Sequence, residues 1–405
     1  MFKKIAKSYD YSLIVSIVLL SLFGLVMIYS ASSVVAPTRY GVPSDYFFQK
    51  QKFHLILGLF ILVLFALIPY KVYQSRKVLK TIFFGSIAAL ALLFIIGHTS
   101  NNAQSWIKLG GSMIQPSEFI KVGMIVYLSA VYAKKQSYIN NFNYAVMPPI
   151  IFLGIICGMV MMQPDFGTAL IIFSIAATII LSSGMGMKSI MKLVGILAAV
   201  ALLLSPIILI KKDEIFSDTR MGRINSFLDP FQYEKGEGYQ LVNSYIAIGS
   251  GGVKGQGLGE SIQKYGYLPE PHTDFIMAVI SEELGIFGVG FVLVLLGFII
   301  LKGYRIAGRC RDPFGSLLAI GISSMIGIQS FINLGGLTGI IPITGVPLPF
   351  VSYGGSSIIL LSISMGILIN VAMFSTYENR YKYRTQETVV PNQETAKGVR
   401  HFSVK

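Results

Sequence analysis

The sequence predicts an all-α polytopic membrane protein with ten transmembrane helices, a large external loop between the seventh and eighth helices, and both termini in the cytoplasm. The composition excludes an ordinary soluble domain, because 53% of the 405 residues are hydrophobic and only 13% are charged, against about 25% charged residues in a typical soluble protein. Apolar runs close to the roughly 20 residues that cross a hydrocarbon core recur along the chain. Lysine and arginine gather in alternate loops, which gives the orientation.

The apolar runs divide the chain into three parts. Residues 1–10 are expected to be a cytoplasmic N-terminus, and residues 11–375 a membrane domain in which residues 211–273 form the external loop. Residues 376–405 are polar and are expected to be a disordered cytoplasmic tail. The ten predicted helices occupy residues 11–31, 53–69, 79–97, 117–133, 145–162, 166–184, 188–210, 274–300, 316–341 and 355–375.

The basic residues of the short loops predict which side faces the cytoplasm. Cations next to membrane helices are retained on the cytoplasmic side, and in this chain every basic cluster falls on the side that carries both termini. The clusters contain Lys3, Lys4, Lys7, Lys71, Arg76, Lys77, Lys80, Lys134, Lys135, Lys188, Lys192, Lys302, Arg305, Arg309, Arg311, Arg380, Lys382 and Arg384.

Several other classes of protein are disfavoured. The net charge of +14 is accounted for by this topology, and the cations form no nucleic-acid-binding motif. Cys157 and Cys310 are expected at different depths, so no disulfide is expected. The four histidines show no metal-ligand spacing, which disfavours a structural zinc site. The first apolar run is longer than a signal-peptide core and is interpreted as an uncleaved helix.

The external loop contains two recognisable stretches. "LVNSYIAIGSGG" alternates apolar and polar positions and predicts a short amphipathic helix lying on the outer leaflet. "GSGGVKGQGLGE" is glycine-rich, but no strand precedes it and no GK[ST] follows it. It is therefore interpreted as a turned or flexible loop and not as a phosphate loop.

Ionisable residues close to membrane spans are costly and are therefore functional candidates. Glu118 and Lys121 lie three residues apart at the start of the fourth helix, on one face. They are either a neutralising pair that lets the helix end approach water or a part of the site. Arg220 and Arg223 also have i, i+3 spacing, so they form either a clamp for a phosphate or pyrophosphate or a face anchored on lipid headgroups.

Two further stretches add candidates on the external side. Trp106, the only tryptophan, lies near Lys108 in an expected external loop and is either an interfacial anchor or a ring presented at a cleft. The stretch "PITGVPLPFVSYGGSS" contains Ser352 and three prolines, so its backbone must be irregular at the membrane edge. Irregular backbone is tolerated there only when it is buried in protein or lines a wet cavity.

Asp274 follows Pro269, Pro271 and His272 in "LPEPHTDFI" and precedes a long apolar run. The prolines exclude regular helix before His272, so Thr273 or Asp274 is expected to begin the eighth helix. An aspartate at that position is most often a cap. In a partly dehydrated external cleft its pKa would rise and it could also accept a proton, so both roles remain open.

Five motifs together resemble one known family. The set "QSWIKLGGSMIQPSEFIK", "QPDFGTA", "RMGRI" followed by "FLDP", "YLPEPHTDFI" followed by "EELG", and "PLPFVSYGGSS" closely resembles the shape, elongation, division and sporulation (SEDS) family of polytopic bacterial membrane proteins. The resemblance runs in order through all ten predicted helices. The stretch "GLGESIQKYGYLPEPHTDFI" is more similar to the division branch and its sporulation relative than to the elongation branch.

The resemblance implies a peptidoglycan glycosyltransferase that polymerises lipid II at the outer face of the cytoplasmic membrane, at the division septum. Asp274 matches the essential aspartate of the family and is expected to be the general base, with undecaprenyl pyrophosphate as the leaving group. The expected substrate-binding residues are Trp106, Lys108, Glu118, Lys121, Arg220, Arg223, His272 and Ser352.

The same resemblance implies binding partners, and the sequence is also compatible with two other functions. The expected partners are lipid II, the nascent glycan strand, membrane lipid, other division proteins and a class B penicillin-binding protein, which is a transpeptidase. A divalent cation, Mg²⁺ or Mn²⁺, could assist at the pyrophosphate. The rival interpretations are a lipid II flippase, which would need a site at the membrane midplane, and a noncatalytic scaffold for the transpeptidase.

Overall fold

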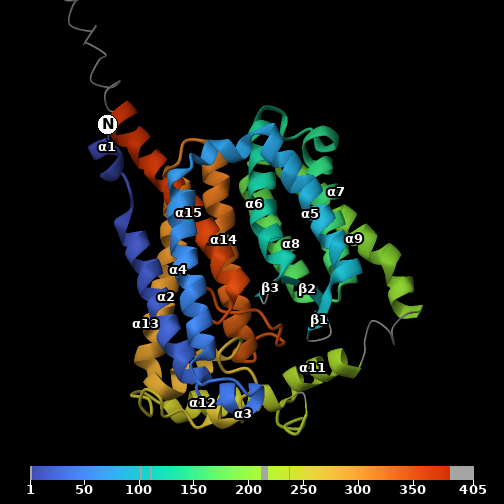
Figure 1. Ribbon diagram of the computed structural model, residues 1–405. Helices are drawn as coiled ribbons and strands as arrows, with labels where there is room; N and C mark the ends of the chain where they lie inside the picture. Colours follow the sequence, from blue (N-terminus) through green and yellow to red (C-terminus); the bar gives the residue numbers. More distant parts are fainter. Residues whose placement is uncertain (1, 101–102, 110–111, 211–217, 237, 384–405) are drawn as a thin grey trace, which may run out of the picture.

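The computed structural model describes residues 2–100, 103–109, 112–210, 218–236 and 238–383 as a bundle of long helices (Figure 1). Within these ranges, ten helices have sixteen or more residues, and each corresponds to one predicted run. They are α2 (Tyr11–Ser32), α4 (Tyr46–Leu67), α5 (Arg76–Ile96), α6 (Pro116–Lys134), α7 (Met147–Met162), α8 (Phe166–Ser182), α9 (Met187–Ile210), α13 (Ile276–Arg309), α14 (Pro313–Leu337) and α15 (Gly355–Tyr377).

The helices confirm an all-helical polytopic membrane protein. Seven of the described helices are long and apolar enough to cross a membrane, and Phe166–Ser182 is apolar but shorter. The number of ten spans stays a prediction. Shorter elements connect the bundle helices: α1 (Phe2–Ala6), α3 (Val35–Tyr40), α11 (Asp218–Leu228) and α12 (Tyr239–Gly251), with single turns at Tyr70–Gln74, Gln136–Tyr138, Phe142–Val146, Gln263–Tyr265 and Glu378–Tyr383.

Several helix ends differ from the prediction, and polar residues explain the differences. α4 begins at Tyr46, seven residues before the predicted start, because "QKQK" continues the helix beyond the apolar run. α13 continues to Arg309 because lysine and arginine are good helix formers. α14 begins at Pro313, where Asp312 caps it by accepting the backbone N–H of Gly315. α14 ends at Leu337, just before Gly339 with its positive φ of 68°.

A small antiparallel sheet stands where the sequence analysis expected an external loop. Its strands, in the order β1-β2-β3, are β1 (His98–Ser100), β2 (Ala103–Leu109) and β3 (Ser112–Ile114). β2 and β3 pair with Lys108 opposite Met113. Most of the predicted tail lies outside the described residues, although helical structure continues through Glu378–Tyr383.

α14 and α15 form the centre of the bundle, and most of the residues in each are buried. α15 packs on α4, while α14 packs on α6, α8 and α13. Small residues bring α4 and α15 together, since a Cβ at Gly366 would lie 2.7 Å from the carbonyl oxygen of Leu62. Such close backbone approach is the usual way in which membrane helices gain packing energy.

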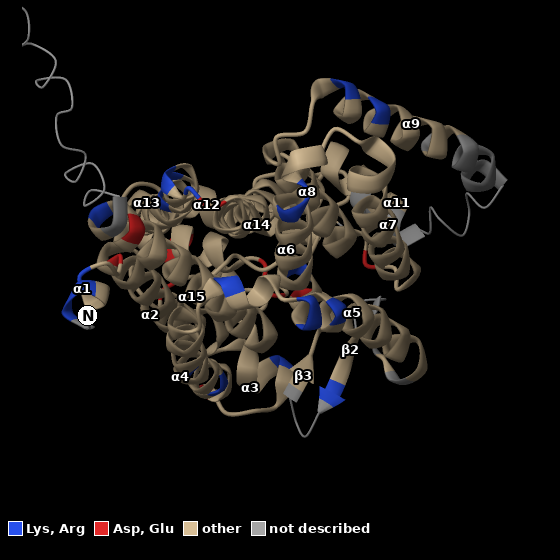
Figure 2. Cartoon of the chain, turned by 90° about the horizontal axis from the view of Figure 1, so that it is seen from above, with Lys and Arg blue, Asp and Glu red and all other residues tan. Residues whose placement is uncertain are grey.

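One end of the bundle carries the basic loops, and hydrogen bonds and ion pairs connect those loops to one another. The Tyr70 hydroxyl donates to Asp312 Oδ2 at 2.8 Å, Lys71 pairs with Glu378 at 3.7 Å, and Lys302 pairs with Asp10 at 3.1 Å. Figure 2 looks along the bundle from this end and shows Lys and Arg on α1, α5 and α9. We call it the basic end. The opposite end holds α3, α11, α12 and the small sheet (Figure 1).

We expect replacement of Asn370 by leucine to lower the stability of the bundle. The Asn370 side chain is fully buried, accepts the backbone N–H of Tyr70 at 2.8 Å and donates to the carbonyl oxygen of Ala66 at 2.7 Å. The Asn370→Leu variant leaves both backbone groups without a partner, at a cost of roughly 1–3 kcal/mol each. The thermal midpoint of the detergent-purified protein measures this loss.

Asn379 provides the matched control, because it is exposed and donates one hydrogen bond to the carbonyl oxygen of Arg309. We expect the Asn379→Leu variant to remain within about 0.5 kcal/mol of the parent. Equal midpoints for the two variants would contradict the structural role assigned to Asn370.

Candidate active site

Asp274 lies at the end of the bundle opposite the basic end, in the last turn before α13. The helix begins at Ile276, with Phe275 as its N-cap residue, so the expected start at Thr273 or Asp274 is wrong. Phe275, rather than Asp274, therefore occupies the N-cap position, and it makes no side-chain cap hydrogen bond. The turn is closed instead by the carbonyl oxygen of Glu270, which accepts the backbone N–H groups of Thr273 and Phe275 at 3.4 Å.

Residues 340–354, which we call the proline segment, hold the turn that carries Asp274. The Ser352 hydroxyl donates to the carbonyl oxygen of Thr273 at 2.6 Å and accepts the backbone N–H of Leu348 at 2.9 Å. The backbone N–H of Tyr353 donates to the carbonyl oxygen of His272 at 2.9 Å. The structure therefore brings three predicted residues, His272, Asp274 and Ser352, into one polar junction.

Asn333 of α14 is a functional candidate that the sequence analysis missed. Its buried amide nitrogen donates to the carbonyl oxygens of both Asp274 and Val346, each at 2.8 Å. One side chain thus joins α14, the turn before α13 and the proline segment. A single asparagine within an apolar helix, where an unpaired amide is expensive, is the signal that could have identified it.

A small recess borders Asp274. Its walls come from α14, from the turn before α13 and from Ile343, Thr344, Gly345 and Val346 of the proline segment. The recess encloses about 10 Å³, which is room for about one water molecule. Gly345 has a positive φ of 73°, and a Cβ there would lie 3.4 Å from Asp274 Oδ2. The recess itself is too small for a sugar ring.

His272 is packed as an aromatic core residue. It is 2% exposed, and its ring lies 4.2 Å from that of Phe47 and 5.6 Å from that of Tyr353, centroid to centroid. Burial, with a smaller contribution from the Arg39 cation, lowers the pKa of His272 to about 4. The ring is therefore neutral near pH 7, and it cannot supply positive charge to a pyrophosphate. Its backbone carbonyl, rather than its ring, holds the proline segment.

Glu118 and Lys121 form a buried ion pair in the first turns of α6. Lys121 Nζ lies 2.6 Å from Glu118 Oε1, and the two side chains are 1% and 7% exposed. Glu118 Oε2 has no hydrogen-bond partner among the described residues. The nearby Gln115 side chain donates to Asp165 Oδ2 at 3.2 Å, and Asp165 caps α8. The pair is thus a charged, internally neutralised group with one carboxylate oxygen still able to accept a hydrogen bond.

Trp106 and Lys108 lie in strand β2, not in a loop. Alternate residues of a strand share a face, so both side chains project from the same side of the small sheet. Trp106 is half-buried and Lys108 is exposed. β3 is joined to α15 through Ser356, whose hydroxyl donates to the carbonyl oxygen of Met113 at 3.2 Å. The sheet is therefore fixed to the end of the bundle that carries Asp274.

Arg220 and Arg223 lie in α11 (Asp218–Leu228). The expected helical i, i+3 spacing is therefore present in the backbone, at the end of the molecule that also holds α12 and the small sheet (Figure 1). Their side chains lie outside the described residues. The predicted amphipathic helix is α12 (Tyr239–Gly251), and it packs on α13.

The glycine-rich stretch is fixed to a break in α13. Gly285 adopts φ 60° and ψ −152°, a conformation that interrupts the helix and that L side chains rarely adopt. Across the break, the backbone N–H groups of Gln256 and Gly257 donate to the carbonyl oxygens of Glu282 and Glu283 at 2.9 and 3.0 Å. The expectation of a turned loop is confirmed, and the loop is bonded directly to the helix backbone.

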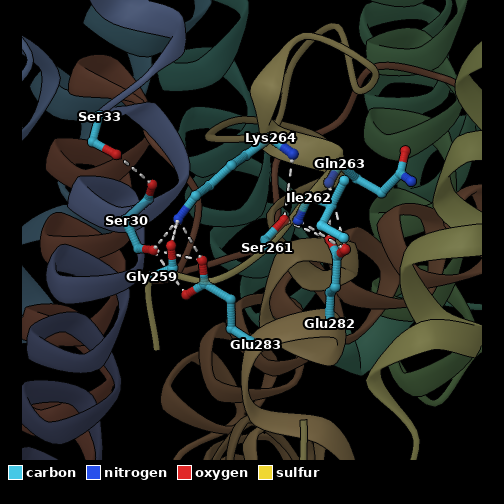
Figure 3. A network of polar contacts seen from close by, with 9 residues as sticks. All are labelled: Ser30, Ser33, Gly259, Ser261, Ile262, Gln263, Lys264, Glu282 and Glu283. Atoms are coloured by element: carbon cyan, nitrogen blue, oxygen red, sulfur yellow. Dashed lines mark hydrogen bonds and ion pairs between the residues drawn. The ribbon is translucent and has the colours of Figure 1, made fainter. Parts of the chain in front are cut away.

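Charged side chains reinforce this contact (Figure 3). Lys264 Nζ lies 2.9 Å from Glu283 Oε1 and donates to the carbonyl oxygen of Gly259 at 2.6 Å. The Ser30 hydroxyl donates to Glu283 at 2.6 Å. Glu282 accepts the hydroxyl of Ser261 and the backbone N–H of Ile262. Lys264 was not among the residues predicted from the sequence, because a lysine in a polar loop gives no signal that it is 2% exposed.

The sequence itself matches a known family over most of its length. Residues 11–377 match the family described as "Cell cycle protein", which comprises FtsW, RodA and SpoVE. This protein belongs to that family. The chain is 59% identical, over 94% of its own length and 95% of the relative's, to "Probable peptidoglycan glycosyltransferase FtsW" of Bacillus subtilis (strain 168). It is 38% identical to "Stage V sporulation protein E" of the same organism, over 91% of its length and 98% of the relative's.

Solved structures of similar proteins share the fold. The family member aligns with a chain described under "Structural coordination of polymerization and crosslinking by a peptidoglycan synthase complex" with a TM-score of 0.72 at 24% identity, covering 92% of this chain and 99% of the other. It aligns with RodA of Thermus thermophilus with a TM-score of 0.61 at 25% identity, covering 92% and 98%. The resemblance predicted from the five motifs is thereby confirmed.

We expect removal of the Lys264 charge to destabilise the fold, because it leaves Glu283 buried and uncompensated. Loss of one partner of a buried ion pair costs about 3–5 kcal/mol, whereas replacement of both partners by apolar residues is often neutral. The Lys264→Met variant should therefore have a lower thermal midpoint than the Lys264→Met, Glu283→Leu double variant. A double variant that is less stable than Lys264→Met would argue against the ion pair.

We expect His272 to make the stability depend on pH. The folded-state pKa of about 4 lies below the value of about 6.5 for an unfolded chain, so the neutral form is favoured on folding. Its contribution is complete above about pH 6.5 and is lost as the pH falls towards 4, by roughly 3 kcal/mol in total. Thermal midpoints from pH 7.5 to 4 should fall less steeply for His272→Asn than for the parent. Parallel curves would contradict the buried neutral ring.

Proposed function

We propose that this protein is a peptidoglycan glycosyltransferase that polymerises lipid II into β-1,4-linked glycan strands at the outer face of the cytoplasmic membrane. The observation that carries the proposal is the 59% identity, over 94% of the chain, to a relative named as a probable peptidoglycan glycosyltransferase FtsW. The same identity favours the division branch of the family and action at the septum.

The charge distribution supports an external site. Lys and Arg collect at the basic end, which the positive-inside rule assigns to the cytoplasm, with ten spans and both termini on that side. The small sheet and α11 lie at the other end (Figure 1). Asp274, which precedes α13, and the proline segment, which precedes α15, belong to the same end. The candidate residues therefore gather where lipid II displayed in the outer leaflet is accessible, with residues 211–273 as an external loop.

In the proposed reaction Asp274 is the general base. It takes the proton from the GlcNAc 4-hydroxyl of one lipid II while that oxygen attacks the MurNAc anomeric carbon of the growing chain, and the bond from that carbon to undecaprenyl pyrophosphate breaks. Conversion of an α-linked donor into a β-linked product requires inversion, hence a single displacement. The half-buried position of Asp274 beside the recess supports this assignment.

The leaving pyrophosphate needs positive charge near it, because stabilisation of developing charge is commonly the largest catalytic effect. Arg220 and Arg223, on one face of α11, are assigned this role together with Lys121. The described residues contain no group of three or more His, Cys, Asp or Glu side chains suited to a metal ion. They do not form a ready-made site for Mg²⁺ or Mn²⁺, and no step of the proposed mechanism passes through a metal.

The remaining candidates are assigned to binding and positioning. Trp106 and Lys108 project from one face of β2, where the ring can stack on a sugar and the ammonium can meet a carboxylate or phosphate. Ser352 and Asn333 hold the turn that carries Asp274. Glu118 fixes Lys121 through their ion pair. The neutral, buried His272 is assigned to packing beneath the site.

A transpeptidase partner fits the same function. One structural neighbour is described as part of a peptidoglycan synthase complex that coordinates polymerization and crosslinking. We therefore propose that this protein works with a class B penicillin-binding protein, which crosslinks the strands, and with other division proteins.

Two other functions make different predictions. A lipid II flippase needs alternating access to a midplane site, whereas the candidate residues here lie at one end of the bundle. A noncatalytic scaffold would tolerate substitution of Asp274.

We expect the Asp274→Asn variant to lose polymerisation of lipid II by about 10²- to 10⁴-fold, the usual contribution of a general base. Gel analysis of the glycan chains made by the purified protein, with and without its partner, measures the loss. Asp229→Asn is the matched control, because Asp229 is an exposed carboxylate in the predicted external loop that precedes Asp274, and it should polymerise at the parent rate.

Parent-rate polymerisation by Asp274→Asn would refute the base assignment and favour a scaffold. A liposome flipping assay on the same preparations tests the rival transport function, since flipping without polymerisation would refute the glycosyltransferase proposal itself.

A further inference from the structure

The basic end holds a pocket that the proposed glycosyltransferase mechanism does not use. It lies between the residue that precedes α2, the last turns of α13 and the last turn of α15, and it encloses about 110 Å³, compared with about 10 Å³ beside Asp274. Its lining consists of Asp10, Lys302, Arg305, Ile306, Arg309, Ala372, Ser375 and Thr376. We call it the basic pocket.

Two of the three cations in the basic pocket remain available for a ligand. Lys302 is engaged, since it lies 3.1 Å from Asp10 Oδ2 and donates to the Ser12 hydroxyl at 3.2 Å. Arg305 and Arg309 are exposed and one helical turn apart, so they share a face of α13. Neither guanidinium takes part in a hydrogen bond or ion pair within the part of the chain that the structure describes.

The rest of the lining is suited to an anion with an apolar part. Ser375 and Thr376 contribute hydroxyls on the α15 side, and Ser375 donates to the carbonyl oxygen of Arg309 at 3.2 Å. That bond ties the wall of α15 to the end of α13. Ile306 and Ala372 form a buried apolar floor. With Asp10 ionised, the lining carries a net charge of +2.

We propose that the basic pocket binds a phosphate-bearing anion. Guanidinium groups match phosphate oxygens with paired hydrogen bonds, and arginine is the residue best suited to this geometry. The predicted cytoplasmic position places the pocket beside a leaflet rich in anionic lipid, so a phospholipid headgroup is the source that the location favours. Free phosphate has the same chemistry and is distinguished below. The site is remote from Asp274 and independent of the proposed reaction.

The experiment measures binding of defined probes to the full-length protein in detergent. Native mass spectrometry compares retention of phosphatidylglycerol with that of phosphatidylcholine, and inorganic phosphate is added as a competitor. We expect the parent to retain phosphatidylglycerol preferentially and each arginine removed to weaken retention about fivefold, the effect of one basic residue near an anionic surface. The test variant is Arg305→Gln, Arg309→Gln, and both positions are exposed, so the fold should persist.

Two control variants distinguish lipid binding in the basic pocket from nonspecific attraction of anionic lipid by positive charge. Lys188→Gln, Lys192→Gln removes the same charge from the start of α9, outside the pocket, and should retain phosphatidylglycerol like the parent. Arg305→Lys, Arg309→Lys keeps the charge but loses the paired hydrogen bonds, so it should lie between the parent and the glutamine variant. The lysine variant also provides the test if the glutamine variant does not fold.

The outcomes are distinct. Displacement of phosphatidylglycerol by millimolar inorganic phosphate would assign the pocket to free phosphate, whereas persistence of the lipid would assign it to the headgroup. The proposal is overturned if the parent shows no preference for phosphatidylglycerol and no binding of phosphate. It is also overturned if the arginine and α9 variants lose retention equally. None of these results depends on polymerisation of lipid II.

Discussion

The break in α13 at Gly285 is the constraint on which the end of the protein that carries Asp274 depends. A broken helix leaves carbonyl and N–H groups without intrahelical partners, and such groups are expensive near a membrane. In this protein the glycine-rich stretch satisfies them, since Gln256 and Gly257 bond the carbonyls on one side of the break and Ile286 donates to Val253 at 3.2 Å. The loop that leads to Asp274 is thereby held against the bundle by main-chain bonds.

Two buried carboxylates near that break also need hydrogen-bond or ion-pair partners. Glu282 receives a hydroxyl and backbone N–H groups, and Glu283 receives the Lys264 ammonium and the Ser30 hydroxyl. Ser30 belongs to α2, so the network also fixes the first long helix to the loop that leads to Asp274. Because an unpaired buried charge is far more costly than a pair, these contacts stabilise one another.

The sequence was sufficient to predict the helices but not the contacts between distant segments. Apolar length predicts each long helix, since it reflects the thickness of the hydrocarbon core, and the motifs predicted the family. The start of α13 was misplaced because the carbonyl of Glu270 closes the turn at Phe275, a tertiary detail without a local signal. Lys264 was missed for the same reason, because its partner lies 19 residues away. Asn333 has a partner 59 residues away, and its only local signal is its place within an apolar helix. The small sheet was also missed, because three short strands resemble loop sequence.

The recess beside Asp274 has a consequence for the chemistry that the proposed mechanism requires. A base strong enough to activate a sugar hydroxyl would equally activate water, and hydrolysis would then terminate the strand. The recess, which has room for about one water molecule and is bordered by the proline segment, leaves little space for bulk water beside this carboxylate. The narrowness of this cavity would thus favour chain growth over wasteful cleavage of the precursor.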